Sequence, residues 1–258
     1  MIRERNNMRS SRLKQVEQYI IDNQTVSFDQ ICDKFNISLN TARRDIKELI
    51  NTGNVSKVYG GVTAVEKTAL VPFQLRDERN HQEKNRIARA AAAMIQNNDI
   101  VFVDSGTTTR HIFEHISKEL SFTVITHSIS VVFGLINQSN IRLIVLPGEL
   151  ERKTNSLYGI NTAERLEDYN IQRAFMAATA VSSDGMVTNS SPLEYEIKRT
   201  AMRRSYEKVL LIDSAKYGTA SLLSYASLQD FDTVITGKKV DASFLSLCEQ
   251  NQVQAITV

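Results

Sequence analysis

One short stretch near the start of the chain carries basic and small polar side chains at a spacing suited to binding DNA. The sequence SLNTARRDIKELI, residues 38–50, places apolar side chains at helical spacing, which predicts a helix with one buried stripe. That stripe consists of Ala42, Ile46 and Leu49. The polar residues that would cap the helix or face outward are Ser38, Asn40, Thr41, Arg43, Arg44 and Lys47. Arginine and lysine bind phosphate oxygens, and arginine also binds guanine edges in the major groove. A helix face that is merely solvated has the same composition, so the neighbouring elements must distinguish a DNA-binding helix from an ordinary surface helix.

Polar residues that directly follow apolar runs form a second set, which could bind a phosphorylated ligand. Ligands of open α/β sheets bind at the carboxyl ends of the strands. After the run DIVFV comes DSGTTT, where Gly106 permits a tight turn and the hydroxyl and free N–H groups suit an anion. Lys216 follows the run KVLLI and could neutralise a phosphate. The residues expected at this site are Asp104, Ser105, Gly106, Thr107, Thr108, Thr109, His127, Ser128, Gly148, Lys153, Glu194, Asp213 and Lys216. Taken singly, DSGTTT is also an ordinary capping turn, Glu194 a possible helix cap and Lys216 a possible surface lysine.

Other reactive residue types form no recognisable catalytic or metal pattern. His111 and His115 are four positions apart, but no HExxH motif or nearby cysteine accompanies them, which favours an exposed helix face. Ser128 lies in nothing like GxSxG, and DSGTTT is not a GxxxxGK[ST] loop for ATP. We therefore expect no catalytic residue, no metal and no cofactor.

The first 63 residues supply the elements that would position the basic helix. SRLKQVEQYIID and FDQICDKF read as helices, with Ser27 and Gln30 spaced as a capping box, and NIS turns the chain into the basic helix. VSKVY then alternates like a strand between turn signals at Gly53-Asn54 and Gly60-Gly61. This order predicts a winged helix-turn-helix domain over residues 8–63, in which Lys57 and Tyr59 of the wing would touch the DNA backbone.

The remainder of the chain predicts a different kind of domain. Residues 64–80 are polar, are interrupted by Pro72 and read as a linker. From residue 81 to 258, apolar runs such as FTVIT and KVLLID alternate with amphipathic segments, beginning with the alanine-rich RIARAAAAMI. The segment TTRHIFEHISKEL reads as one of the helices. This alternation predicts a mainly parallel sheet covered on both faces, so the fold class is α/β.

Composition bounds the class of protein. The chain has 258 residues and a net charge of +2, and its 42% hydrophobic content is ordinary for a water-soluble protein. Residues 1–62 hold ten Lys/Arg and seven Asp/Glu, a surplus that permits nucleic-acid binding by that part. No apolar run approaches a membrane span and no secretory signal is evident, and the two cysteines lie far apart. We expect a cytoplasmic protein without a membrane partner.

Several segments, in order along essentially the whole chain, resemble DeoR-type bacterial transcription regulators. ARRDI with GNVSKVYGGV resembles the signature of their DNA-binding domain, and DSGTTT, AFMAAT and DSAKYG resemble their effector-binding domain. The resemblance implies a C-terminal fold related to ribose-5-phosphate isomerase and the CoA transferases, without the enzymatic role. It also implies a phosphorylated sugar or polyol effector and a homo-oligomer, a dimer or tetramer.

Within that family, KVYGGVTAVEKTALVPF and LEYEIK resemble repressors of myo-inositol catabolism, which implies an effector from inositol breakdown. Three positions depart from the family pattern. His127 stands where Asn is usual, Pro147 where Gly is frequent and Ala215 where Ser is frequent. These departures bear on the identity of the effector rather than on its class.

The prediction is thus a repressor that binds double-stranded operator DNA and is released by a phosphorylated sugar or polyol. Two alternatives stay open at this point. The first is a transcriptional activator of the same class. The second is an isomerase-like enzyme with a DNA-binding appendage, using Asp104, Asp213 and Lys216 as acid, base and electrophile.

Overall fold

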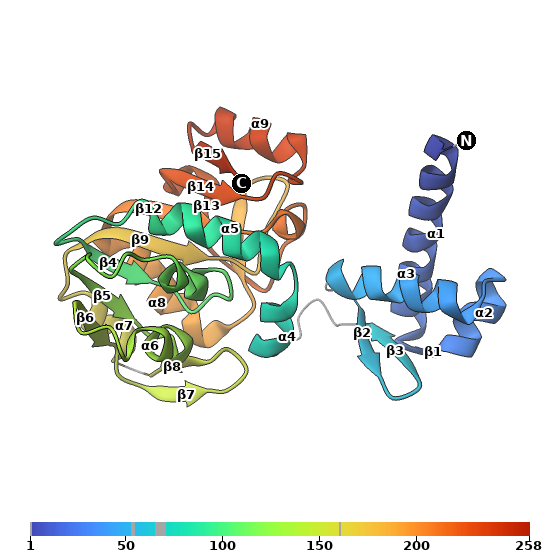
Figure 1. Ribbon diagram of the computed structural model, residues 1–258, viewed down its shortest axis with the longest axis horizontal. Helices are drawn as coiled ribbons and strands as arrows, with labels where there is room; N and C mark the ends of the chain where they lie inside the picture. Colours follow the sequence, from blue (N-terminus) through green and yellow to red (C-terminus); the bar gives the residue numbers. More distant parts are fainter. Residues whose placement is uncertain (1, 53–54, 65–70, 160) are drawn as a thin grey trace. The chain divides into compact units, whose positions relative to one another are not determined.

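The computed structural model describes residues 2–52, 55–64, 71–159 and 161–258. The chain divides into two compact units, residues 1–69 and 70–258, which are described separately below (Figure 1). The predicted turn at Gly53-Asn54 and much of the predicted linker lie outside the described residues. The finer boundaries proposed for the domains therefore stay a prediction.

The N-terminal unit is a winged helix-turn-helix, as predicted. Its elements are α1 (Ile2–Asn23), β1 (Thr25–Ser27), α2 (Phe28–Phe35), α3 (Leu39–Thr52), β2 (Val55–Val58) and β3 (Gly61–Ala64). The Ser27 hydroxyl accepts a hydrogen bond from the Gln30 N–H, and the Gln30 side chain accepts one from the Ser27 N–H, so the expected capping box begins α2. Strand β1 was not predicted; it pairs antiparallel with β3 and enlarges the wing to three strands.

The C-terminal unit is built on a seven-stranded sheet in which every neighbouring pair is parallel. The strand order is β15 (Gln254–Thr257), β14 (Thr233–Thr236), β12 (Ser205–Leu211), β9 (Ile171–Ala177), β4 (Ile100–Val103), β5 (Phe122–Thr126) and β6 (Ile141–Val145). The chain moves outward from β4 to β6 and then resumes at β9 on the other side of β4. The order therefore reverses between β4 and β9, which is where open α/β sheets bind ligands.

Helices cover both faces of this sheet and bury two apolar clusters (Figure 1). On one face lie α5 (His81–Ala92), the 3₁₀-helix η1 (Thr109–Glu114) and α6 (Ile129–Leu135). On the other lie α7 (Thr162–Leu166), α8 (Pro192–Arg204) and α9 (Ala242–Gln250). Adjacent strand residues alternate between the clusters: Val101 and Val103 belong to the cluster that includes α5, while Phe102 belongs to the cluster that includes α8. The predicted three-layer α/β fold is confirmed.

Two local features differ from expectation. The segment predicted as a helix after DSGTTT is only the short 3₁₀-helix η1. The Thr109 hydroxyl donates to the carbonyls of Asp104 and Gly106, at 2.7 and 2.9 Å, and such bonds compete with α-helical ones. The chain also forms α4 (Phe73–Glu78) and short antiparallel strands outside the main sheet. These strands are β7 (Glu149–Glu151), β8 (Ser156–Tyr158), β10 (Ala180–Val181), β11 (Met186–Asn189) and β13 (Leu223–Ser227). Among the described helices, none is long and apolar enough to cross a bilayer.

Candidate functional site

Helix α3 presents the predicted basic face to solvent. Its inward residues, Ala42, Ile46 and Leu49, are at most 3% exposed and pack in the core of the N-terminal unit. The side chains of Asn40, Arg43, Arg44 and Lys47 are exposed, and that of Thr41 is partly exposed. The Ser38 hydroxyl accepts a hydrogen bond from the Thr41 N–H and so caps the helix. The arginines are thus available to a partner rather than committed to the protein interior.

A partly buried ion pair that the sequence did not reveal fixes α3 against α1. Asp45 is 1% exposed, and its two carboxylate oxygens accept from Arg12 Nε at 2.8 Å and Arg12 Nη2 at 3.3 Å. A two-point contact of this kind restricts rotation of α3 about its own axis. It therefore helps to determine which side chains of α3 face outward.

The tip of the wing is the tight turn between β2 and β3. Gly60 has φ +76°, a left-handed conformation that glycine adopts without strain. Gly61 faces the carbonyl of Val26, and an added Cβ would lie 2.3 Å from that oxygen. The turn leaves Lys57 exposed and Tyr59 wholly exposed. Both side chains are therefore accessible to a binding partner of the N-terminal unit.

A pocket opens in the C-terminal unit at the reversal of strand order. It lies where β4 and β9 end, beside the start of α8. Its lining residues are Arg76, Ser105, Gly106, Thr107, Thr108, Ala177, Ala178, Thr179, Asn189, Glu194, Lys198, Leu211, Ile212 and Lys216. Gly106 is required by close packing, because an added Cβ would lie 2.2 Å from the Cβ of Ala177. The first residues after two neighbouring parallel strands thus form the pocket wall.

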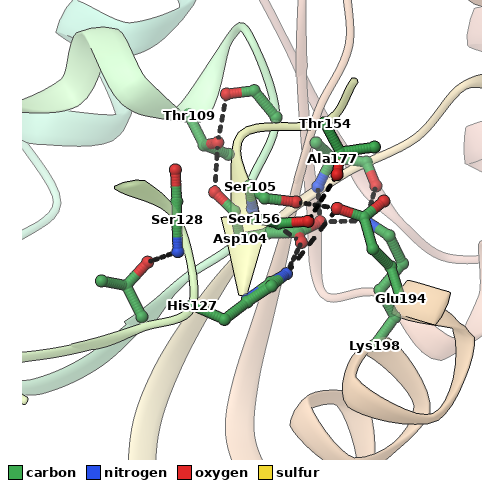
Figure 2. Close-up of polar contacts among 12 residues, drawn as sticks. Asp104, Ser105, Thr109, His127, Ser128, Thr154, Ser156, Ala177, Glu194 and Lys198 are labelled. Atoms are coloured by element: carbon green, nitrogen blue, oxygen red, sulfur yellow. Dashed lines mark hydrogen bonds and ion pairs between the residues drawn. The ribbon is translucent and has the colours of Figure 1, made fainter. Parts of the chain in front are cut away.

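Beneath the pocket is a buried polar network, shown in Figure 2. Asp104 is fully buried and accepts from the N–H groups of Ser105 and Ala177, at 2.8 and 2.9 Å. Lys198 Nζ forms an ion pair with Asp104 and also donates to the Ala177 carbonyl at 3.1 Å. The Ser105 hydroxyl donates to Glu194. Glu194 and Lys198 lie one turn apart on α8 and point together toward the strand ends.

His127 completes this network. It is fully buried, stacks on Phe102, and its Nε2 lies 3.8 Å from Asp104 and 3.9 Å from Glu194. Neither ring nitrogen has a hydrogen-bond partner among the described residues. Burial would raise the pKa of Glu194, yet the adjacent His127, the charge on Lys198 and the Ser105 hydroxyl hold that pKa below its ordinary value. Glu194 is therefore an anion at neutral pH.

Two cations of the pocket have no such partner. In the described part of the chain, no ion pair joins Arg76 or Lys216 to a carboxylate, although both line the pocket. Burial lowers the pKa of Arg76, and it also lowers the pKa of Lys216. A partly buried cation without a contacting anion is incompletely compensated. These two side chains are the ones best placed to bind an anionic ligand.

The predicted effector-site residues fall into three groups. Those that line the pocket are Ser105, Gly106, Thr107, Thr108, Glu194 and Lys216. Asp104, Thr109 and His127 are fully buried in or beside the network that supports it.

The third group does not line the pocket. Ser128 caps α6 through the Val131 N–H, and Asp213 accepts from Asn80 at 2.8 Å. Gly148 lies against the backbone of Tyr158, and Lys153 lies in the turn between β7 and β8.

Sequence reasoning missed several lining residues, of which the polar ones are Arg76, Thr179, Asn189 and Lys198. A signal existed for Lys198, because it follows Glu194 by four positions in a predicted helix. The expectation of an exposed histidine pair was wrong for His111, which is fully buried and contacts Asp77 and Glu114. No cluster that could hold a metal ion occurs among the described residues.

Comparisons with known proteins agree with this architecture. Residues 12–68 match the model of the DeoR-like helix-turn-helix domain, and residues 79–238 match that of the DeoR C terminal sensor domain. The chain is 39% identical to the HTH-type transcriptional regulator IolR of Bacillus subtilis, over 95% of this chain and 98% of the relative. It is 28% identical to the L-fucose operon activator of Haemophilus influenzae, over 90% of this chain and 92% of the activator.

It is also 24% identical to the glycerol-3-phosphate regulon repressor of Escherichia coli, over 89% and 91% of the two chains. Among solved structures, ribose 5-phosphate isomerase A of Methanocaldococcus jannaschii matches with a TM-score of 0.40 and 17% identity. That match covers 54% of this chain and 55% of the isomerase.

Proposed function

The chain belongs to the DeoR family of transcriptional regulators, and we propose that it represses a sugar or polyol catabolic operon until a phosphorylated effector releases it from DNA. The observation that carries the effector class is the pocket at the strand reversal, where Arg76 and Lys216 form no ion pair with a carboxylate of the described residues. A phosphate monoester would supply the missing negative charge and bind the N–H and hydroxyl groups of residues 105–108.

The proposed DNA contacts are the outward residues of α3 and the tip of the wing. Arg43, Arg44 and Lys47 would bind bases and phosphates in the major groove, with Ser38, Asn40 and Thr41 beside them. Lys57 and Tyr59 would contact the backbone. One such module buries too little surface for tight specific binding, so we propose a dimer or tetramer on repeated half-sites. Sedimentation equilibrium at micromolar concentration tests this, and a monomer bound tightly to one half-site would contradict it.

Arg44→Ala tests the DNA face. Operator affinity should fall, and the slope of log K against log salt should flatten by about one unit if one phosphate contact is lost. Lys118→Ala, which removes an exposed lysine of the C-terminal unit, is the matched control. Fluorescence anisotropy on a duplex selected with the wild-type protein measures both quantities. An unchanged affinity and slope would remove Arg44 from the interface.

The effector class is tested by binding. Thermal shift followed by calorimetry should detect phosphorylated sugars and inositol-pathway intermediates, while the matching unphosphorylated polyols should bind far more weakly. Support for an inositol compound comes from the motif likeness and from the 39% identity to IolR of Bacillus subtilis. If unphosphorylated polyols bind as well as their phosphates, the proposed class is wrong.

The direction of regulation needs its own measurement, because similar relatives include both a named activator and a named repressor. A reporter gene downstream of the operator should be silent with the protein and active after effector is added. Effector binding can only release DNA if the ligand prefers the conformation with low DNA affinity. The isomerase alternative would be supported by turnover of a sugar phosphate by the purified protein.

A further inference from the structure

Helix α4 is the first described element after the segment that leads from the DNA-binding unit, and it is firmly attached to the C-terminal unit. Phe73 is 5% exposed, and its N–H donates to the Lys153 carbonyl at 2.8 Å. Asp77 accepts two hydrogen bonds from Arg110, at 2.8 and 2.5 Å. Both ends of α4 are therefore held by side chains and backbone that lie in other segments.

Arg76 projects from α4 into the pocket and also holds the chain that precedes the helix. Its Nε donates to the Val71 carbonyl at 2.9 Å, and its guanidinium lies over the Phe73 ring, 5.5 Å from the ring centre. Lys84 Nζ donates to the Arg76 carbonyl, which fixes the backbone at this position. Arg76 is thus the pocket-lining residue that comes first in the chain, and it bonds Val71, a described residue of the predicted linker.

We propose that Arg76 is an anion-contacting residue of the effector site and that it couples occupation of the pocket to the position of Val71 in the predicted linker. This inference rests on the proposed effector class, a phosphate monoester. It adds a residue that the sequence did not indicate and a physical route from the pocket to the linker.

The guanidinium of Arg76 has enough N–H donors to contact a phosphate and the Val71 carbonyl at the same time. Its N–H donors form a rigid plane, and Nε alone bonds Val71, so the Nη groups can bind a phosphate. An anion on the Nη groups restrains the guanidinium and, through Nε, restrains Val71. Lysine at this position would retain the charge but could not hold both partners in fixed geometry. Lys216 shares the pocket, and among the described residues no hydrogen bond joins its side chain to Val71, which makes it the matched comparison.

The test measures the dissociation constant of inorganic phosphate, by calorimetry at constant ionic strength, for the full chain with and without a selected operator duplex. The ratio of the two constants is the coupling factor, typically about 5 to 150 in allosteric proteins. The variants are Arg76→Gln, Arg76→Lys and Lys216→Gln, with Arg86→Gln as an exposed charge control on α5. Circular dichroism and the affinity for DNA without phosphate confirm that each variant is folded.

We expect Arg76→Gln to weaken phosphate binding about tenfold or more, the usual effect of losing a charged hydrogen bond, and to bring the coupling factor near one. Arg76→Lys should retain most of the binding and lose most of the coupling. Lys216→Gln should weaken binding and keep the coupling factor of the wild type.

Equal phosphate affinity in wild type and Arg76→Gln would refute the anion contact. Weaker phosphate binding by Arg76→Gln with an unchanged coupling factor would refute the connection to the linker. A coupling factor of one in the wild type would refute it as well. Absence of phosphate binding in the wild type would instead overturn the effector class itself, and the inference with it.

Discussion

Lys198→Met should destabilise the C-terminal unit strongly, because it leaves a carboxylate buried without its cation. The side chains of Lys198 and Asp104 are 3% and 0% exposed, so solvent cannot replace the lost charge. Removing one partner of a buried pair costs about 3–5 kcal/mol. Asp104 would still accept from the N–H groups of Ser105 and Ala177, which places our expectation near the lower limit, about 3 kcal/mol. For a unit of this size that corresponds to a fall in melting temperature of about 6–12 °C.

Urea unfolding followed by circular dichroism measures the free energy of unfolding, and the double variant Lys198→Met/Asp104→Asn provides the control. Methionine retains most of the packing of the lysine stem, and asparagine retains the shape of the carboxylate without its charge. The double variant should therefore be more stable than Lys198→Met alone, with a coupling energy of about 2 kcal/mol. A loss below about 1 kcal/mol in Lys198→Met, or strictly additive effects, would refute the view that this pair is a structural charge pair.

Three further predictions concern other parts of the chain. Burial lowers the pKa of Lys84 from 10.5 to about 8. Between pH 8 and pH 10.5 the unfolded chain therefore binds more protons than the folded chain, so the free energy of unfolding rises with pH. Urea unfolding at pH 7 to 10.5 measures this dependence, and Lys84→Met should abolish the rise. The same dependence of the free energy of unfolding on pH in the variant and the wild type would contradict the prediction. Gly106→Ala should lower the free energy of unfolding by about 1–3 kcal/mol and weaken phosphate binding, because the new methyl group would lie 2.2 Å from the Cβ of Ala177. Urea unfolding measures the first effect and calorimetry the second. Asp45→Asn should destabilise the N-terminal unit by about 1–3 kcal/mol through loss of the charged bonds to Arg12, and a melting profile identical to that of the wild type would refute this.

The elements whose burial follows a simple period were predictable from the sequence. In α3, Ala42, Ile46 and Leu49 follow helical spacing, and the basic residues lie outside the stripe, so the exposed face could be inferred before the structure was known. The strands of the parallel sheet were predictable because burial on both faces requires continuous apolar runs. The short antiparallel strands, such as β10 with only two residues, carry no periodic signal and were missed.

The candidate pocket was predictable only where its residues follow strands. Ser105 to Thr108 come directly after β4, and the rule for parallel sheets places them at the ligand edge. Arg76 belongs to a segment that reads as a polar linker. Hydrogen bonds from distant parts of the chain, such as that from the Phe73 N–H to the Lys153 carbonyl, hold its helix beside the pocket. Asn189 and Thr179 reach the pocket through short strands and loops outside the main sheet. Contacts of this kind depend on tertiary structure, which the local sequence does not specify.

The structure separates the three cations that line the pocket, Arg76, Lys198 and Lys216, by their partners. Lys198 is neutralised by Asp104, so it supports the pocket rather than attracting a ligand. Arg76 and Lys216 interact electrostatically with Glu194 and Asp213, respectively, but form no ion pair with a carboxylate in the described part of the chain. Because these acidic groups offset the field of the cations at a distance, recognition of an anion must come from direct contact with the guanidinium and the ammonium group. The hydroxyl groups of a neutral polyol can accept hydrogen bonds from these cations but carry no charge, so the proposed phosphate, rather than the carbon skeleton, should dominate the affinity for the effector.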